Sequence, residues 1–171
     1  VVFEGGLKRG PNREDSYYDK VDITNLNRQQ YDIAALGTLK TDALTKNIKR
    51  FNPFIEITSQ CVKVNEDNAA EIFGGYKIVC EAFDKAENKA MLVNSILSEC
   101  GDTKIVSGSG MAGFGSSNTI VTRKINDRFY LCGDTKSDMN GGLALAAPRV
   151  AICAAHEANM ILRLLIGEKE V

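Results

Sequence analysis

The sequence predicts an α/β fold in which helices cover both faces of a mostly parallel sheet, with an antiparallel portion toward the C-terminus. Two observations lead to this prediction: apolar strand patterns alternate with helical patterns in the middle of the chain, and the last segment is a long apolar helix. Strands that alternate with helices of this length are typical of βαβ units. A chain of 171 residues is long enough for one such domain with a sizeable core.

Four helices follow from apolar residues at helical spacing and from residues that cap or stop a helix. Residues 41–50 place apolar side chains on one face, and Asn52-Pro53 ends this helix. Asn65 supplies a capping side chain for a second helix, which Gly74-Gly75 closes. The other two helices are predicted at residues 86–99 and at about residues 148–166.

Five strands are predicted from runs of β-branched and aromatic residues bounded by turn residues. The last two strands are expected to form an antiparallel hairpin around Asn126-Asp127. The predicted strands span Ile55–Val64, Lys77–Phe83, Lys104–Ser107, Thr119–Ile125 and Arg128–Leu131.

Two segments stand where a parallel sheet binds its ligands, beyond the carboxyl ends of the strands. Asp84 and the glycine-rich run Gly108–Gly115 each follow a predicted strand directly. The run lacks the Lys-Ser/Thr that completes a phosphate-binding loop, so a phosphate cradle is unsupported and the run could be only a flexible crossover. Asp84 has an alternative as well, because aspartate is a favoured cap for a helix that begins near Ala86.

The composition excludes several functional classes. With 21 basic and 22 acidic residues, the net charge of −1 gives no bulk attraction to nucleic acid or to an anionic membrane. No apolar stretch approaches the length of a membrane span, and no secretory signal pattern opens the sequence. We therefore expect a cytoplasmic protein with no nucleic-acid partner and no membrane partner.

The five cysteines are scattered and form no Cys-x-x-Cys pair, so no zinc site is expected. Several lie in apolar runs, where a buried thiol behaves as a small hydrophobic group. The role of Cys132 stays open. His156 is the only histidine and lies in the apolar last helix, which favours a core or interface residue over a catalytic base.

One string carries most of the functional information: residues 18–31, Tyr-Asp-Lys-Val-Asp-Ile-Thr-Asn-Leu-Asn-Arg-Gln-Gln-Tyr. By itself it is a strand end followed by a polar loop with an arginine. It closely resembles the nucleotide loop of the ThiF/MoeB/HesA and ubiquitin-activating family, because Asp-x-Val-x-x-x-Asn-Leu-x-Arg-Gln reads through without a gap. Leu36–Lys40, Arg50–Pro53 and Glu81–Asn88 match further family segments in order. The resemblance covers roughly residues 17–166 and is closest to the zinc-free ThiF type.

The resemblance implies a Rossmann-like three-layer sheet and a single ThiF-like adenylyltransferase domain over residues 1–171. It implies ATP-dependent adenylation of the C-terminal Gly-Gly carboxylate of a small ThiS-like sulfur-carrier protein of β-grasp fold, in thiamine or related sulfur-transfer biosynthesis. ATP and Mg²⁺ would be the cofactors. A homodimer is the expected assembly, and the apolar C-terminal helix would contribute a buried face to it.

Residue by residue, the resemblance assigns the charges that adenylation requires. Arg28 and Lys40 would neutralise phosphate charge and Asp84 would hold magnesium, so these three are the predicted catalytic residues. Asn25 would orient phosphate or ribose. The further predicted nucleotide contacts are Gly5, Gly6, Asp19 and Gln29.

The N-terminal region departs from the family pattern. Only Gly5-Gly6-Leu7 resembles the glycine-rich turn Gly-x-Gly-Gly-x-Gly, and there is no room for a complete βαβ unit before Tyr18. The position of the ribose-binding acid is Tyr17. The nucleotide-binding unit is therefore predicted to be incomplete. The two cations also have simpler interpretations: Arg28 could pair with a surface acid, and Lys40 could be a solvated residue at a helix start.

Two other functional classes stay open. A non-catalytic carrier-binding protein or dimer partner that has lost ATP use is favoured by Tyr17 and by the short glycine turn, whereas Arg28, Lys40 and Asp84 favour an enzyme. A nicotinamide-dependent dehydrogenase on the same sheet is disfavoured, because the dinucleotide fingerprint and its acid are missing. The polar, glycine-containing residues 134–142 are a candidate mobile cover for the carrier tail.

Overall fold

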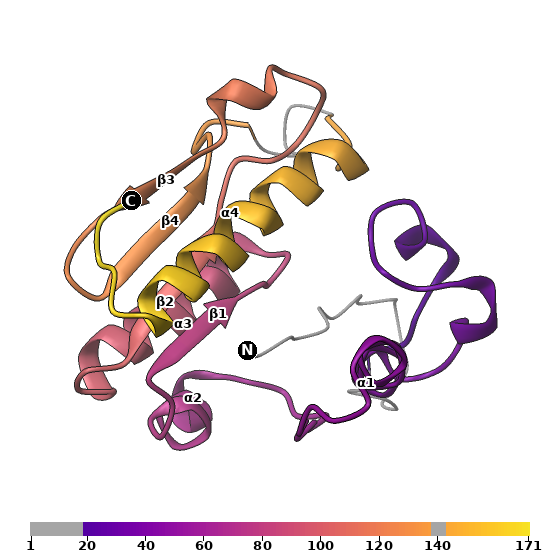
Figure 1. Ribbon diagram of the computed structural model, residues 1–171, viewed down its shortest axis with the longest axis horizontal. Coiled ribbons are helices and arrows are strands. Elements are labelled where there is room, and N and C mark those ends of the chain that lie inside the picture. Colours follow the sequence, from indigo (N-terminus) through magenta and orange to yellow (C-terminus); the bar gives the residue numbers. More distant parts are fainter. Residues whose placement is uncertain (1–18, 138–142) are drawn as a thin grey trace. The chain divides into compact units, whose positions relative to one another are not determined.

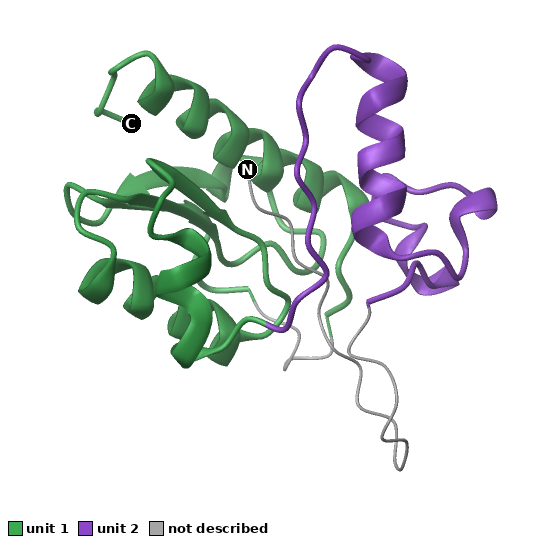
Figure 2. Cartoon of the chain, turned by 90° about the horizontal axis from the view of Figure 1, so that it is seen from below, with its two compact units in different colours: residues 1–3, 64–171 green, residues 4–63 purple. Residues whose placement is uncertain are grey.

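The computed structural model describes residues 19–137 and 143–171. The chain divides into two compact units, which Figure 2 colours separately and which are described here one at a time. Unit 1 comprises Val1–Phe3 and Val64–Val171, and unit 2 comprises Glu4–Lys63. The predicted nucleotide contacts Gly5 and Gly6 lie outside the described residues. The single ThiF-like domain over residues 1–171 stays a prediction.

Unit 1 is built on a four-stranded sheet of order β1-β2-β4-β3 (Figure 1). The strands β1 (Ile78–Glu81), β2 (Lys104–Gly108) and β4 (Phe129–Gly133) are parallel neighbours. Strand β3 (Val121–Lys124) pairs with β4 in the antiparallel sense, as the predicted hairpin requires. The mostly parallel sheet with an antiparallel portion toward the C-terminus is therefore confirmed.

Helices cover both faces of this sheet. The helices α2 (Glu66–Phe73) and α3 (Ala86–Glu99) pack together on one face, and α4 (Ala147–Leu165) lies on the other (Figure 1). Successive side chains of a strand point to opposite faces. Ile105 of β2 accordingly lies in the core beneath α2 and α3, and the next residue, Val106, lies in the core beneath α4. This alternation produces the three-layer arrangement.

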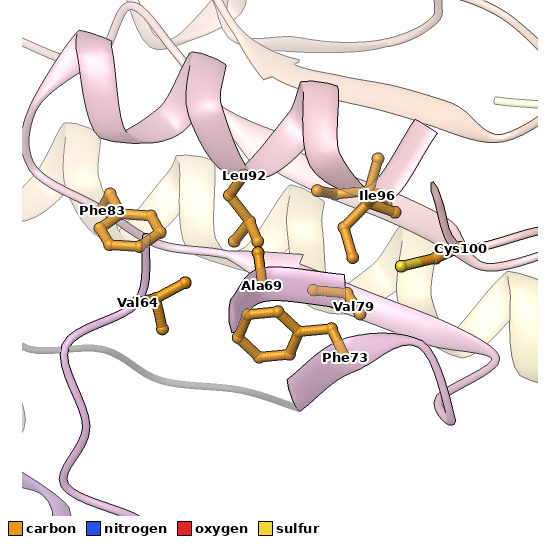
Figure 3. Packing of buried hydrophobic residues seen from close by; sticks show 9 residues of the cluster. Val64, Ala69, Phe73, Val79, Phe83, Leu92, Ile96 and Cys100 are labelled. Carbon is orange, nitrogen blue, oxygen red and sulfur yellow. The ribbon is translucent and has the colours of Figure 1, made fainter. Parts of the chain in front are cut away.

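Each face of the sheet has its own hydrophobic core. Beneath α2 and α3, Phe73 and Ile96 converge with Val79 of β1 (Figure 3). Beneath α4, Tyr130 of β4 packs with Cys153 of that helix. All five side chains are at most 2% exposed. Burying a large apolar side chain contributes about 1.5–3 kcal/mol, so these two clusters account for much of the stability of unit 1.

The helices of unit 1 follow their local signals closely. Helix α3 has the predicted bounds, and α4 begins and ends one residue earlier than predicted. Helix α2 begins after Asn65, whose side chain accepts a hydrogen bond from the Asn68 backbone, while the Asn68 side chain accepts one from the Asn65 backbone. This reciprocal capping box explains the sharp start of a short helix. Within residues 19–137 and 143–171, no helix is long and apolar enough to cross a bilayer.

Unit 2 contains one longer helix and two short turns. The turns η1 (Ile23–Asn25) and η2 (Ile33–Ala35) precede α1 (Lys40–Phe51). An antiparallel bridge between Lys20 and Leu39 closes the loop that holds the turns. Helix α1 confirms the helix predicted at residues 41–50 and ends before Asn52-Pro53, because the residue that precedes a proline disfavours helical backbone.

The strand predicted at Ile55–Val64 is wrong. This segment contains no strand and pairs with none of the described strands. Ile55 and Val62 are about two-fifths exposed, at 40% and 41%. Only Val64, where the chain enters unit 1, is buried in a core. A β-rich composition makes a strand only where a neighbouring strand receives its backbone hydrogen bonds.

Gly133 allows the ends of β2 and β4 to meet closely. Its φ is +129°, and a Cβ at this position would lie 1.6 Å from the carbonyl oxygen of Ser109. We expect Gly133→Ala to lower the free energy of unfolding by at least about 2 kcal/mol, since backbone would have to move. Chemical denaturation followed by circular dichroism measures this change. Gly75→Ala is the matched control, because a Cβ at Gly75 meets nothing within 4 Å; equal losses in both variants would contradict the prediction.

Candidate functional site

The nucleotide-loop motif forms a compact turn in unit 2. The carboxylate of Asp22 accepts a hydrogen bond from the backbone nitrogen of Thr24 at 2.8 Å. In return, Oδ1 of Asn25 accepts one from the backbone nitrogen of Asp22 at 2.9 Å. Asn25 is buried, so its side-chain oxygen fixes the turn from within. Its side-chain nitrogen donates to no other described residue and can therefore serve a ligand.

Arg28 extends from the same turn. Its Nη1 donates to the carbonyl oxygen of Thr24 at 2.8 Å and to Oδ1 of Asn27 at 3.0 Å. No carboxylate of the described residues pairs with it, so the surface ion pair considered as an alternative is not formed there. A guanidinium that is steadied through one nitrogen can still present its remaining donors to a phosphate as a fork.

Lys40 and Asp19, which are 21 residues apart, come together in unit 2. Lys40 Nζ lies 2.7 Å from Asp19 Oδ2, and the two side chains are only 12% and 19% exposed. The backbone nitrogen of Lys40 also donates to the carbonyl oxygen of Asp19 at 2.9 Å. Lys40 is the first residue of α1, but it is a largely buried, ion-paired lysine and not a solvated one.

Gln29 carries a buried acceptor without a partner. Its Oε1 makes no hydrogen bond within the part of the chain that the structure describes. A buried polar atom that loses water without replacement costs about 1–3 kcal/mol, and such atoms are rare in native proteins. A hydroxyl or amine group of a ligand bound beside this turn would satisfy the atom.

Asp84 lies in unit 1, just beyond the carboxyl end of β1. Its side chain is exposed and makes no hydrogen bond or ion pair with any described residue. Lys85 is the N-cap residue of α3, and no side-chain hydrogen bond caps that helix. The alternative that Asp84 caps the helix is therefore wrong. The carboxylate is instead available to a cation from solvent.

The donor set at Asp84 suits a hard cation that brings other ligands with it. Across the two described stretches, 19–137 and 143–171, no group of three or more His, Cys, Asp or Glu side chains is placed to hold a metal ion. Magnesium commonly binds to one or two carboxylates and completes its shell with substrate phosphates and water. One exposed carboxylate is compatible with that chemistry.

A buried carboxylate, Glu81, supports the turn that carries Asp84 and was not among the predicted site residues. It is 1% exposed, and both its oxygens lie 3.1 Å from Nζ of Lys89 on α3. It also accepts hydrogen bonds from Ser107 Oγ and from the backbone nitrogen of Phe83. Glu81 thus ties the end of β1 to β2 and α3. A single charged residue within the apolar run 78–83 was the available signal.

A second carboxylate, Glu157 of α4, was also not predicted and lies at the ends of β1 and β2. It accepts hydrogen bonds from the thiols of Cys153 at 3.5 Å and Cys80 at 3.7 Å. A Cβ at Gly108 would lie 2.1 Å from Glu157 Oε1, so the glycine makes room for this side chain. Burial, opposed in part by the charge of Lys89 and by the thiol hydrogen bonds, raises the pKa of Glu157 to about 7.

The contacts of Cys132 and His156 indicate structural roles for both residues. Cys132 is fully buried, and Thr122 Oγ1 lies 3.5 Å from its sulfur. Burial raises the pKa of the Cys132 thiol to about 11, which leaves almost no thiolate at neutral pH. His156 is half-buried, with Nδ1 3.0 Å from the same threonine oxygen. Both residues therefore help to join α4 to the β3–β4 hairpin.

Comparison with known proteins identifies the family. The ThiF family model matches residues 18–171. The adenylyltransferase and sulfurtransferase UBA4 of Eremothecium gossypii is 32% identical over 158 residues, which cover 87% of this chain and 34% of that protein. UBA4 of Saccharomyces cerevisiae is 33% identical over 157 residues, which cover 87% of this chain and 35% of that protein. The chain belongs to the ThiF family, and it spans about a third of the length of these curated relatives.

Solved structures with the same fold include the E. coli tRNA N6-threonylcarbamoyladenosine dehydratase TcdA. Its complex with AMP matches with a TM-score of 0.75 and 19% identity, covering 87% of this chain and 73% of that chain. Its complex with ATP matches with a TM-score of 0.69 and 19% identity, covering 88% and 75%. At this level of identity the likeness shows the fold, and it agrees with the predicted Rossmann-like layers.

The raised pKa of Glu157 predicts a dependence of stability on pH. The unfolded chain releases this proton near its ordinary pKa of 4.5, whereas the folded protein holds it up to about pH 7. The folded state binds more protons in that window, so the free energy of unfolding should fall as the pH rises through it. We expect a fall of about 2 kcal/mol between about pH 5 and about pH 8 relative to Glu157→Gln. Denaturation curves across this range measure the difference, and parallel profiles for the two proteins would contradict it.

Proposed function

We propose that this chain catalyses the ATP-dependent adenylation of the C-terminal Gly-Gly carboxylate of a small ThiS-like β-grasp sulfur-carrier protein. The observation that carries the proposal is that Asn25 and Arg28 are held in one turn of unit 2, where the motif of the nucleotide loop is complete, while Lys40 at the start of α1 is ion-paired to Asp19 of the same motif. The curated relatives are named adenylyltransferases, and the TcdA structures hold AMP and ATP, which supports nucleotide use. We place the protein in the cytoplasm, as a homodimer, in thiamine or related sulfur-transfer biosynthesis.

Adenylation demands positive charge more than it demands a nucleophile on the enzyme. An oxygen of the carrier carboxylate bonds to the α-phosphorus of ATP, and the bond to pyrophosphate breaks. Negative charge on the phosphate oxygens must be neutralised in a site where donors are already oriented. Arg28 supplies a guanidinium steadied by Thr24, and Lys40 supplies an ammonium held in place by Asp19.

The polar side chains beside these cations suit the nucleoside. The unpartnered Oε1 of Gln29 would accept a hydrogen bond from a ribose hydroxyl or from the adenine amine. The side-chain nitrogen of Asn25 would donate to phosphate or ribose while its oxygen holds the loop. By the family resemblance, Asp84 of unit 1 is the residue that would hold magnesium, an ion whose charge offsets that of phosphate groups in this class of reaction. Glu81 and Lys89 would keep the Asp84 turn in place.

The role of Arg28 is tested by exchange of labelled pyrophosphate into ATP in the presence of a Gly-Gly-terminated ThiS-type carrier. We expect Arg28→Met to reduce the exchange rate by about 100-fold, because a charge that stabilises the transition state is lost. Lys46→Met is the matched control, since Lys46 is an exposed cation of α1. Equal exchange in Arg28→Met and in the wild type would overturn the assignment.

Asp84 is tested in the same assay with magnesium varied. Asp84→Asn should lower exchange at least about tenfold at limiting magnesium and recover partly at high magnesium, because the variant binds the ion more weakly. Asp102→Asn is the control, since Asp102 is an exposed acid in the loop before β2, at the opposite ends of the parallel strands. Carrier binding by the wild type without any exchange would instead support the non-catalytic carrier-binding protein.

A further inference from the structure

The carboxyl ends of β2 and β4 continue into two segments that are hydrogen-bonded to each other. We call residues 108–117, which follow β2, the glycine segment. The backbone nitrogen of Ser109 donates to the carbonyl oxygen of Cys132 at 2.7 Å. Beyond β4, the backbone nitrogen of Asp134 donates to the carbonyl oxygen of Gly110 at 3.0 Å. The start of the glycine segment is therefore fastened to the chain that leaves β4.

One buried arginine joins the far end of the glycine segment to the same place. Arg149, in the first turn of α4, is 4% exposed. Its Nη1 donates to the carbonyl oxygens of Gly115 and Ser116, each at 2.8 Å, and its Nη2 donates to Asp134 Oδ2 at 2.7 Å. Asp134 also accepts hydrogen bonds from the Lys136 and Ser137 backbones at 2.8 Å. The contacts of Arg149 thus connect three segments: the glycine segment that follows β2, the residues that follow β4, and the first turn of α4.

The energetics of this pair favour a positioning role over a stabilising one. Burying two charges costs about as much as their attraction returns, so a buried ion pair is weak support for stability. Arg149 Nε is also buried without a hydrogen-bond partner among the described residues, which adds a further cost. Such a pair is best explained by the conformation it imposes, here that of the glycine segment.

The conformation held by the pair presents an apolar side chain outward. Phe114, between the two fastened ends, is 89% exposed. The neighbouring backbone nitrogen of Gly113 donates to the carbonyl oxygen of Ala144 at 2.9 Å, so the apex is fastened as well. A phenylalanine on a rigid loop loses little entropy when a partner covers it.

We propose that Arg149 and Asp134 are positioning residues that hold the glycine segment as a docking surface for the carrier protein, with Phe114 as its apolar contact. This inference rests on the proposed function, which supplies the Gly-Gly-terminated carrier as the partner. The surface lies at the carboxyl edge of the parallel strands, the same edge that carries Asp84. A carrier seated there would bring its tail toward that edge.

The experiment uses a fluorescently labelled ThiS-type carrier ending in Gly-Gly, with binding measured by anisotropy and exchange measured as above. Phe114→Ser changes only an exposed side chain, and we expect it to weaken carrier binding at least about tenfold without changing the KM for ATP. Ile125→Ser is the matched control, because Ile125 is an exposed apolar residue at the other end of the hairpin strands, 51% exposed. Asp134→Asn keeps the acceptor for the local backbone and removes the charge that faces Arg149, and it should raise the KM for carrier selectively.

The outcomes separate this inference from the proposed function. Exchange by the wild type together with unchanged carrier binding in Phe114→Ser would overturn the docking surface and leave the proposed function standing. Carrier binding that is lost in Phe114→Ser, with no exchange in the wild type, would support the docking surface and overturn catalysis. If Asp134→Asn raised the KM values for carrier and ATP equally and lowered the unfolding midpoint, the pair would be structural and the positioning role overturned. A wild type that binds no carrier would overturn both proposals.

Discussion

Parallel pairing of β1, β2 and β4 is the constraint on which the rest of unit 1 depends. Parallel strands end at a common edge, so the segments that follow them are collected there however far apart they lie in the chain. Asp84 follows β1, the glycine segment follows β2, and Asp134 follows β4. The antiparallel β3 runs in the opposite direction, so its carboxyl end does not lie at this edge. It is the last strand of the sheet, beyond β4. The carboxyl edge is therefore where unit 1 concentrates its polar chemistry.

A buried carboxylate, Glu81, and a half-buried one, Glu157, flank the ends of β1 and β2 on opposite faces of the sheet. Glu81 is neutralised by Lys89 and by hydrogen-bond donors, and it locks the strand ends to α3. Among the residues that the structure describes, Glu157 has only thiols as direct hydrogen-bond partners, and its pKa rises toward neutrality because burial penalises its charged form. Glu81 thus joins elements through an ion pair and hydrogen bonds on one face, whereas Glu157 on the other face has a pKa raised toward neutrality. The two carboxylates differ because α3 supplies a lysine to Glu81, whereas the neighbours of Glu157 supply thiols.

Local signals predicted the helices well and one strand badly. The capping side chain of Asn65 and the stop at Gly74-Gly75 were sufficient for α2, because capping depends on neighbours a few residues away. The run Ile55–Val64 has the composition of a strand and forms none, because strand formation depends on a partner that composition does not specify. The motif that resembles the family's nucleotide loop was identified from its spacing, and the cap that holds this turn, between Asp22 and Asn25, is likewise local.

The sequence by itself determined the fold class, the helices, the order of the strand and helix patterns, and the family, since each depends on periodicity or on a short motif. Only the tertiary structure decided which side chains meet. Lys40 with Asp19, Arg149 with Asp134, and Glu157 with Cys80 each join residues that no local pattern relates. The first pair depends on the bridge between Lys20 and Leu39 in unit 2, and the other two depend on how α4 packs across the sheet of unit 1. Both are properties of many simultaneous contacts. Long-range polar contacts therefore cannot be predicted from local sequence patterns, because the packing of the elements decides which side chains meet.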